Sequence, residues 1–340
     1  MSRVYADANT RFGPAWYDYE RTHIDWNVPD NYEIMHRVGG GRYSEVFRGI
    51  DTTTEDACII KVLKPVAKRK IKREIKILRN LTGGPNIVGL LDVVHDPPSR
   101  SHSLIMEFVD STEWKELFST FSDLEIKHYV FQLLTALEFV HSRGIMHRDV
   151  KPGNVMFDRQ QRKLRLIDWG LAEFYHSGTE YHIRVGSRYY KAPELLTDDK
   201  KYDYSLDLWS VGCMLASMIF RREHFFRGKD NEDQLYRIVK VLGTDSFERY
   251  LQKYDLRISV SHPGLLESHA KQPWTKFGNT DNRPNVTPES IDLLDRLLRY
   301  DHYERFTAAE AMAHAYFNIV RLGDAKKIAE AVSDSGFCST

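Results

Sequence analysis

The spacing of hydrophobic and polar residues changes along the chain from a strand pattern to a helical one. Residues 32–63 alternate between apolar and polar positions and are divided by turn residues, which predicts antiparallel strands. Ile71, Ile75 and Leu78 then recur at helical spacing, and residues 123–141 repeat that spacing over a longer stretch. The pattern predicts strands in the first part of the chain and helices after them.

Composition and charge exclude several classes of protein. Hydrophobic residues make up 42% of the 340 residues, which is enough for a sizeable core. Lys+Arg and Asp+Glu both count 48, so the net charge identifies no partner. Three scattered cysteines argue against a secreted disulfide scaffold. We expect no signal peptide, because the first 25 residues carry four acidic residues and no apolar core. We expect no membrane span, because the longest apolar stretch, residues 211–220, is too short.

A polar segment over residues 147–154 carries candidate catalytic groups close together. Asp149 could accept a proton from a hydroxyl group, Lys151 could contact a phosphate during transfer, and Asn154 could hold a metal ion. Asp168 follows an apolar strand and would be a natural second ligand for Mg²⁺. An ordinary charged loop is the alternative, but it does not account for the spacing of all four groups.

These residues resemble the protein kinase family, which combines His-Arg-Asp, a downstream Asn and Asp-aromatic-Gly. The chain has His147-Arg148-Asp149, then Asn154 and Asp168-Trp169-Gly170. The resemblance implies a bilobal α+β fold, in which a small antiparallel sheet with one main helix forms the N-terminal lobe and helices form the larger C-terminal lobe. It also implies transfer of a phosphoryl group from ATP or GTP, with Mg²⁺, to a protein hydroxyl. We expect four parts: residues 1–30, an aromatic-rich segment packed on the core; 31–108, the N-terminal lobe; 109–320, the C-terminal lobe; and 321–340, a helix over 324–332 and a tail.

Further residues correspond to the family's nucleotide site. Lys61 on a strand resembles the lysine that holds the α and β phosphates, and Glu74 resembles the acid that positions it. Asp149 would act as the base and Lys151 would steady the γ phosphate, while Asn154 and Asp168 would hold Mg²⁺. The expected nucleotide-binding residues are Val38, Gly39, Gly41, Ser44, Val46, Ile59, Lys61, Met106, Glu107, Val109, Asn154, Met156, Ile167 and Asp168.

Over residues 4–317 the details resemble the catalytic (alpha) subunits of casein kinase 2, and Asp-Trp-Gly is the most specific mark. That resemblance implies serine/threonine specificity, activity without phosphorylation, and a location in cytoplasm and nucleus. The chain departs from that family's pattern at Gly40, which should loosen the glycine-rich loop, and at Met106 and Gly153. We also expect the Trp169 indole to donate a hydrogen bond that fixes its turn.

The same resemblance implies a dimeric regulatory (beta) subunit and an α₂β₂ tetramer. Ile34, Phe47 and Ile105 stand at the matching positions on the predicted strands. An ordinary half-buried strand face is the alternative explanation of these residues. We expect no direct binding of nucleic acid and no membrane partner.

Local charge predicts which protein segments are phosphorylated. Two basic clusters would flank the cleft and favour acidic substrates by focusing positive potential. A solvated helix face or a nuclear-import segment is the alternative for the first cluster. The first cluster is Lys68, Arg69, Lys70, Lys72 and Arg73, and the second is Arg184, Arg188 and Lys191.

Two other classes of function compete with this hypothesis. A pseudokinase would keep the fold without catalysis, but Lys61, Glu74, Asp149, Asn154 and Asp168 are all present. A kinase of small molecules or lipids is disfavoured. The chain has the Ala-Pro-Glu segment at residues 192–194 and a late arginine, Arg305, which in the family build a peptide-docking platform.

Overall fold

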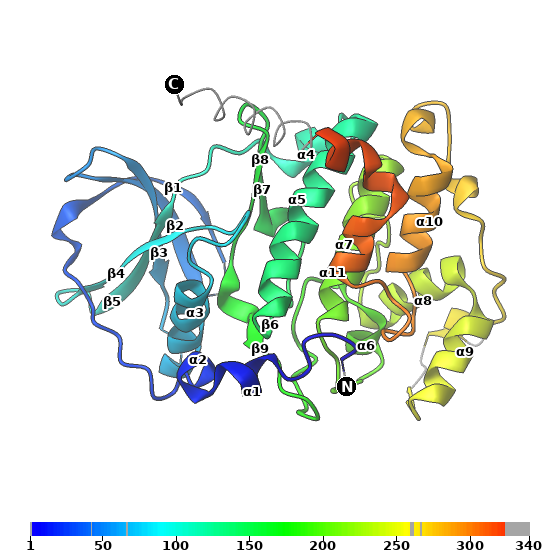
Figure 1. Cartoon of the computed structure of the whole chain (residues 1–340), viewed down its shortest axis with the longest axis horizontal. Helices are drawn as coiled ribbons and strands as arrows, with labels where there is room; N and C mark the ends of the chain where they lie inside the picture. The colour runs from blue at the N-terminus through cyan, green and yellow to red at the C-terminus, as the bar shows by residue number, and fades with distance from the viewer. Residues whose placement is uncertain (1, 42, 66, 259–261, 266, 324–340) are drawn as a thin grey trace, which may run out of the picture.

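The computed structural model describes residues 2–41, 43–65, 67–258, 262–265 and 267–323. The chain forms two lobes joined after the last strand of a five-stranded sheet (Figure 1). The sheet-rich N-terminal lobe and the larger helical lobe confirm the predicted α+β fold. The expected helix over residues 324–332 lies outside the described residues.

The N-terminal lobe is an antiparallel sheet with strand order β1-β2-β3-β5-β4. One long helix, α3 (Lys68–Asn80), accompanies it and buries Ile75, Ile77 and Leu78. The first turn of α3 is basic, which is unfavourable at a helix N-terminus, so tertiary packing must stabilise the helix. The strands are β1 (Tyr32–Gly40), β2 (Ser44–Asp51), β3 (Ala57–Leu63), β4 (Leu90–Asp96) and β5 (Ser101–Glu107).

The C-terminal lobe is built around α7 (Ser205–Ile219), which is buried along almost its whole length. Its neighbour α5 (Asp123–Ser142) begins with a capping box between Ser122 and Glu125. Two short two-stranded sheets, β6-β9 and β7-β8, complete this lobe. The remaining elements are α4 (Trp114–Leu117), β6 (Ile145–Met146), β7 (Val155–Asp158), β8 (Lys163–Leu166), β9 (Glu173–Phe174), α6 (Pro193–Leu196), α8 (Asn231–Leu242), α9 (Thr244–Lys253), α10 (Pro288–Leu297) and α11 (Ala308–Ala313).

Within the described residues, no helix combines the length and the apolar character that crossing a membrane requires.

The N-terminal segment runs along both lobes as an extended strap with two short helices, α1 (Ala8–Phe12) and α2 (Pro14–Tyr17) (Figure 1). Arg3 binds Glu310 of the C-terminal lobe through two hydrogen bonds of 3.0 and 2.7 Å. The buried Asn9 amide donates to the carbonyl oxygens of Gly144 and Tyr175. The strap therefore contacts the activation segment as well as the helical core.

The strap ends on the sheet edge, where it ties the two lobes together. Asn27 N–H donates to the Val93 carbonyl oxygen at 3.0 Å and its own carbonyl accepts from His95 N–H at 2.9 Å, so a short extension continues the sheet beyond β4. The Tyr32 hydroxyl then donates to Asp92 at 2.9 Å. These contacts couple the sheet edge to the start of β1.

A small apolar cluster on the sheet changes the expectation for a partner surface. Ile105 is fully buried in this cluster, whereas Ile34 is 56% exposed and Phe47 is partly buried. Tyr32 packs against the same cluster. Ile105 therefore offers no accessible surface to a partner, which corrects the expectation that it lies in the interface.

A buried ion pair joins the end of the activation segment to the C-terminal lobe. The Arg305 guanidinium donates to both carboxylate oxygens of Glu194 at 2.8 and 3.0 Å, and neither side chain is exposed. Burial alone would raise the pKa of Glu194, but the Arg305 charge outweighs it and holds that pKa below the usual range. The carboxylate therefore stays ionised in the core.

We predict that Arg305→Met lowers the free energy of unfolding by about 3–5 kcal/mol, because it leaves a buried carboxylate without its partner. Urea unfolding at pH 7 measures this change. The matched control is Arg296→Met, which breaks an exposed ion pair with Asp292 and should cost at most about 1 kcal/mol. Equal losses for the two variants would contradict the assignment.

The same pair gives a pH dependence. Because the folded-state pKa of Glu194 is lowered, its contribution to stability is present above the unfolded pKa of about 4.3. That contribution is lost as pH falls through the folded pKa. The stability difference between the wild-type protein and Arg305→Met should thus persist at pH 6 and shrink below about pH 4.

Candidate active site

A cavity of about 610 Å³ opens between the two lobes. Every residue expected to bind the nucleotide lines it, and so do the expected catalytic residues Asp149, Lys151, Lys61 and Glu74. The residues come from β1, β2, β3, α3, the β5 hinge and the loops around β7 and β8. The fold thus brings together in one cavity groups that lie more than 100 residues apart in the sequence.

Lys61 is the centre of the charged groups in this cavity. Its buried ammonium group donates to Glu74 Oε1 at 2.7 Å and to Asp168 Oδ1 at 2.8 Å. Burial would lower the pKa of Lys61, but the two carboxylates outweigh that effect and raise it above the usual value. Partial burial of Asp168 acts in the opposite sense, and the Lys61 charge keeps its pKa below the usual range. Lys61 and Asp168 are therefore both charged at neutral pH.

A second cluster surrounds Asp149. Lys151 Nζ donates to Asp149 Oδ2 at 2.7 Å and to the Ser187 hydroxyl at 2.9 Å, while that hydroxyl donates to Asp149 Oδ1 at 2.9 Å. The sequence analysis did not identify Ser187 as part of this cluster. Its position four residues before Lys191, in the segment leading to Ala192-Pro193-Glu194, was the only hint.

The groups around Asn154 fit a magnesium ion. The Asn154 amide nitrogen donates to the Asp149 carbonyl oxygen and to Oδ2, so its amide oxygen is the atom that can face a cation. Asp168 is half-exposed toward the cavity. No group of three or more His, Cys, Asp or Glu residues able to hold a metal occurs in the described chain. Mg²⁺ would thus take Asn154, Asp168 and phosphate oxygens, which suits its preference for few protein ligands.

Backbone contacts fix the catalytic loop. The buried Asp207 carboxylate of α7 accepts from His147 N–H at 2.9 Å and from Arg148 N–H at 2.8 Å. Arg148 and Asp168 adopt left-handed φ angles of 67° and 58°, which cost energy for residues with side chains. Such strain persists only because the surrounding contacts hold both residues in place.

Trp169 stabilises its turn in a different way from the one expected. Its indole nitrogen is buried and has no hydrogen-bond partner among the described residues, so the prediction of a fixing hydrogen bond was wrong. The ring is fully buried and packs edge-on against His147, with ring centres 4.8 Å apart. Trp169 therefore acts through packing against the catalytic loop.

A carboxylate joins the activation segment to both lobes. Glu173 forms ion pairs with Arg73 of α3 at 2.5 Å and with Arg148 of the catalytic loop at 3.6 Å. Arg73 and Arg148 are almost buried, and Arg148 also donates to the Leu171 carbonyl oxygen at 2.7 Å. Glu173 thus supplies the negative charge that brings α3 and the catalytic loop together, a role that the sequence reasoning missed.

The first basic cluster is divided between two uses. Arg69 pairs with Glu20, and Lys72 donates to the Glu20 carbonyl oxygen at 2.9 Å, so both hold the N-terminal strap. Lys68 is exposed, and Lys70 lines the mouth of the cavity with its ammonium 4.8 Å from the Tyr43 ring centre. Only Lys68 and Lys70 of this cluster therefore stay available to a substrate.

The second basic cluster is open. Arg184 and Arg188 are exposed and form no ion pair within the described part of the chain. Lys191 is half-buried, and burial together with the nearby Arg188 lowers its pKa. Three cations thus follow the activation segment toward Asp149.

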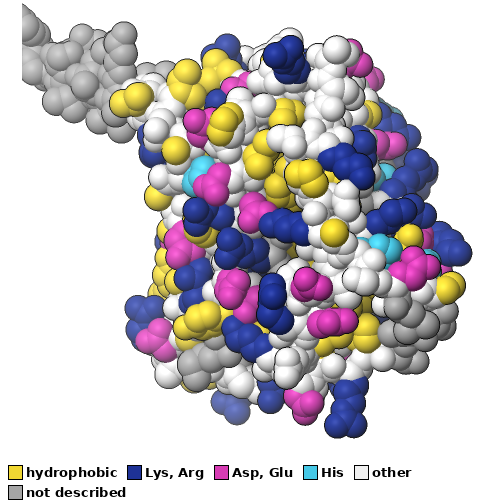
Figure 2. Space-filling view, turned by 90° about the vertical axis from the view of Figure 1, so that its right-hand side faces the viewer, with side chains coloured by type: hydrophobic (Ala, Val, Ile, Leu, Met, Phe, Trp, Pro, Cys, Tyr) yellow, Lys and Arg dark blue, Asp and Glu magenta, His cyan; other side chains and the backbone are white. Residues whose placement is uncertain are grey.

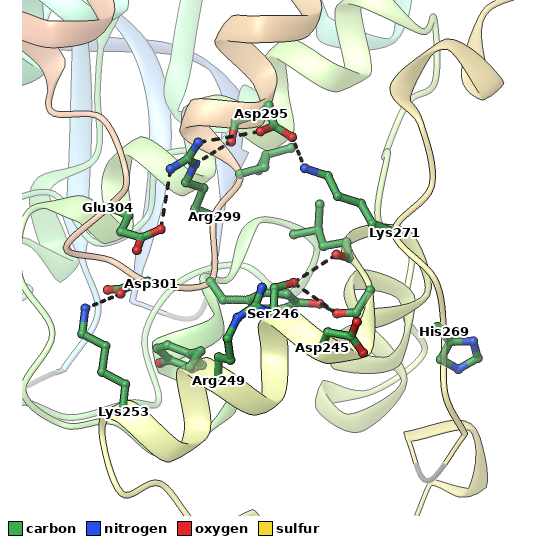
Figure 3. Close-up of a pocket in the computed structure, with 15 residues that line it drawn as sticks. Asp245, Ser246, Arg249, Lys253, His269, Lys271, Asp295, Arg299, Asp301 and Glu304 are labelled. Atoms are coloured by element: carbon green, nitrogen blue, oxygen red, sulfur yellow. Dashed lines mark hydrogen bonds and ion pairs between the residues drawn. The ribbon is translucent and has the colours of Figure 1, made fainter.

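A second large cavity, of about 520 Å³, lies in the C-terminal lobe between α9 and the end of α10. Its charges mostly neutralise one another, since Asp295 contacts Lys271 and Arg299 while Asp301 contacts Lys253 (Figure 3). Basic and acidic side chains are also interleaved over this end of the molecule (Figure 2). It lacks the converging catalytic groups of the cavity between the lobes.

A comparison with known families agrees with this geometry. A profile of the protein kinase domain matches residues 32–317. The chain belongs to the protein kinase family. Members of the family transfer a phosphoryl group from ATP with the help of Mg²⁺. In this kinase the cavity between the lobes is therefore the candidate active site.

We predict that Asp149→Asn lowers kcat by about 10²-fold or more, because asparagine cannot take up the hydroxyl proton. Initial phosphotransfer rates measure the loss, and an unchanged urea midpoint confirms that the variant is folded. The control is Asp110→Asn, a change of an exposed aspartate near the hinge that should leave kcat within twofold. An Asp149→Asn enzyme with the wild-type rate would refute the role of Asp149.

Proposed function

We propose that this protein kinase is a constitutively active serine/threonine kinase of the casein kinase 2 catalytic-subunit type. It transfers the γ phosphate of ATP or GTP to hydroxyl groups in acidic sequence contexts. The observation that carries the proposal is the assembled charge network of Lys61, Glu74 and Asp168, which leaves no catalytic group to be brought into place. The support for the finer type is the sequence resemblance, above all Asp168-Trp169-Gly170.

Each residue has a defined part in the proposed transfer. Lys61, held by Glu74, binds the α and β phosphates, and Asn154 and Asp168 hold Mg²⁺, which neutralises phosphate charge when it is bound. Asp149 orients the acceptor hydroxyl and takes its proton. Lys151 lies within hydrogen-bond distance of Asp149 and meets the γ phosphate. The chemistry is mainly positioning and charge stabilisation.

Two competing functions have less support. A pseudokinase would not need the hydrogen bond of 2.7 Å between Lys61 Nζ and Glu74 Oε1. It would also not need the hydrogen bond between Lys151 and Asp149. A kinase of lipids or small molecules would not need the platform that the Glu194–Arg305 pair anchors behind the activation segment. A protein acceptor is thus the better hypothesis.

Charge supports acidic substrates. Arg184 and Arg188 are exposed cations without ion pairs in the described chain, and Lys191 continues them toward Asp149. Acids that follow the acceptor would meet these cations. Lys68 and Lys70 supply positive charge on the N-terminal lobe.

We predict that the double variant Arg184→Ala/Arg188→Ala raises KM for an acidic peptide about three- to tenfold, because each exposed contact contributes up to about 1 kcal/mol. KM for ATP should not change. The matched control is Arg249→Ala, an exposed arginine of the C-terminal lobe (Figure 3). Unchanged KM in the double variant, or preference of the wild-type enzyme for a basic peptide, would overturn the substrate assignment.

The apolar walls of the cavity support the use of both nucleotides. Ile59, Met156 and Ile167 form these walls, and Met106 of β5 also lines the cavity. The same peptide assay run with GTP tests this part of the proposal. An efficiency below about one-thousandth of that with ATP, a gap of roughly 4 kcal/mol, would limit the enzyme to ATP.

Activity without phosphorylation is supported by Glu173, whose carboxylate occupies the basic site formed by Arg73 and Arg148. A phosphate on the activation segment would otherwise have to supply this charge. The N-terminal strap adds contacts from Asn9 to the same segment.

We predict that Glu173→Gln lowers kcat about five- to tenfold, because partly buried, charge-assisted hydrogen bonds contribute about 1–3 kcal/mol. Steady-state kinetics of the bacterially expressed enzyme measure this loss. Glu180→Gln, a change of an exposed glutamate on the same segment, is the matched control. If the two variants keep the same kcat, Glu173 does not hold the segment.

A regulatory beta subunit and a location in cytoplasm and nucleus remain part of the proposal. Of the residues expected at the interface, the exposed Ile34 and the partly buried Phe47 remain available to such a partner. We predict co-elution with a purified beta subunit at micromolar concentration, and its loss in Ile34→Glu. Leu124→Glu, at an equally exposed position of α5, should still co-elute. Binding that survives Ile34→Glu would place the partner on another surface.

A further inference from the structure

In the glycine-rich loop, the side chain of Arg37 occupies the space that a side chain on Gly40 would need. A Cβ atom on Gly40 would lie only 2.7 Å from Arg37 Nη2 and 3.2 Å from Glu45 Oε2. The φ angle of Gly40 is not in the left-handed region, so backbone conformation does not require glycine there. The space beside Gly40 is therefore reserved for the Arg37 guanidinium.

Arg37 belongs to a group of three charged residues, which we call the loop latch: Arg37, Glu45 and Lys64. Arg37 Nε donates to Glu45 Oε2 at 2.6 Å, and Lys64 forms an ion pair with Glu45 Oε1 at 2.8 Å. Lys64 Nζ also donates to the Gly41 carbonyl oxygen at 2.9 Å. One carboxylate thus bridges two cations, and one of these cations reaches the glycine-rich loop itself.

The latch connects the glycine-rich loop to β3, the strand that carries Lys61, and both of these parts would hold phosphates. Arg37 lies on β1, Glu45 on β2, and Lys64 directly after β3, three residues beyond Lys61. A backbone hydrogen bond from Lys64 N–H to the Tyr43 carbonyl oxygen, 2.9 Å long, acts at the same place. A shift of the loop relative to Lys61 would therefore have to break the latch.

We propose that the loop latch positions the glycine-rich loop over the nucleotide phosphates, in place of the side chain that Gly40 lacks. Gly39, Gly40 and Gly41 line the nucleotide cavity, whereas the three latch residues do not. They are positioning residues that act through the loop backbone. The proposal rests on the proposed use of ATP at this site, and it replaces the expectation that Gly40 loosens the loop.

The side chains of the latch are partly exposed to solvent, so its ion pairs are weak. The side chains of Arg37, Glu45 and Lys64 are 60%, 32% and 41% exposed. Exposed ion pairs contribute little individually and are screened by salt. The latch should therefore change nucleotide affinity by a few-fold and leave global stability almost unchanged.

The test compares Arg37→Ala, Gly40→Ala and the double variant by steady-state kinetics of the full chain with Mg·ATP. Arg37→Ala should raise KM for ATP about two- to fivefold, with kcat and KM for the peptide within a factor of two. Gly40→Ala should have the same effect because its Cβ displaces the guanidinium. The double variant should be no worse than Arg37→Ala, since the methyl group then has nothing to displace.

Two controls separate positioning from other effects. Arg37→Lys keeps a cation beside Glu45 and should recover much of the affinity for ATP, while Arg249→Ala removes an arginine of the other lobe and should change nothing. Unchanged KM for ATP in Arg37→Ala, or additive effects in the double variant, would overturn the latch. A wild-type protein that does not use ATP would instead overturn the proposed function.

Discussion

One buried ammonium group, Lys61 Nζ, connects the parts of this kinase that must act together. It bonds Glu74 on the helix of the N-terminal lobe and Asp168 on the turn that follows the C-terminal lobe hairpin. A buried cation with two carboxylates is stable only while both partners stay in place, because a lone charge in such a site is costly. This one interaction therefore fixes the positions of three parts of the site relative to one another: β3, α3 and the turn at Asp168.

The rest of the molecule keeps this interaction formed. Asp207 of α7 fixes the backbone of the catalytic loop through two hydrogen bonds, and Glu173 joins α3 to the same loop through ion pairs. The N-terminal strap runs along both lobes and bonds to the activation segment through Asn9 (Figure 1). In the proposed function, these side chains take the place of a phosphate on the activation segment.

The sequence predicts those parts of the site whose chemistry requires particular residues at particular spacings. Lys61, Asp149, Asn154 and Asp168 could be found in this way, because phosphoryl transfer leaves few substitutes for them. The change from strand to helix periodicity predicted the order of strands and helices, and the resemblance to protein kinases implied the two lobes. Boundaries were less certain: the spacing of Ile71, Ile75 and Leu78 indicates the main helix but not its start at Lys68 or its end at Asn80.

Contacts between distant residues were not predictable from the pattern. A run of basic residues gives no indication that Arg69 and Lys72 bind the strap at Glu20 or that Arg73 binds Glu173, because each pairing depends on the folded chain. Ile105 looked like a surface residue on a strand, yet its apolar neighbours bury it completely. The indole of Trp169 similarly packs where a hydrogen bond was expected.

The central claim is that the catalytic groups are assembled without phosphorylation. The most direct measurement uses wild-type protein treated with a phosphatase, shown by intact-mass spectrometry to carry no phosphate, and follows the first seconds of peptide phosphorylation. The account predicts that phosphorylated peptide accumulates linearly from the first turnover, and that its initial rate is proportional to the enzyme concentration. A lag that shortens as enzyme concentration rises, together with the appearance of phosphate on the activation segment, would contradict it.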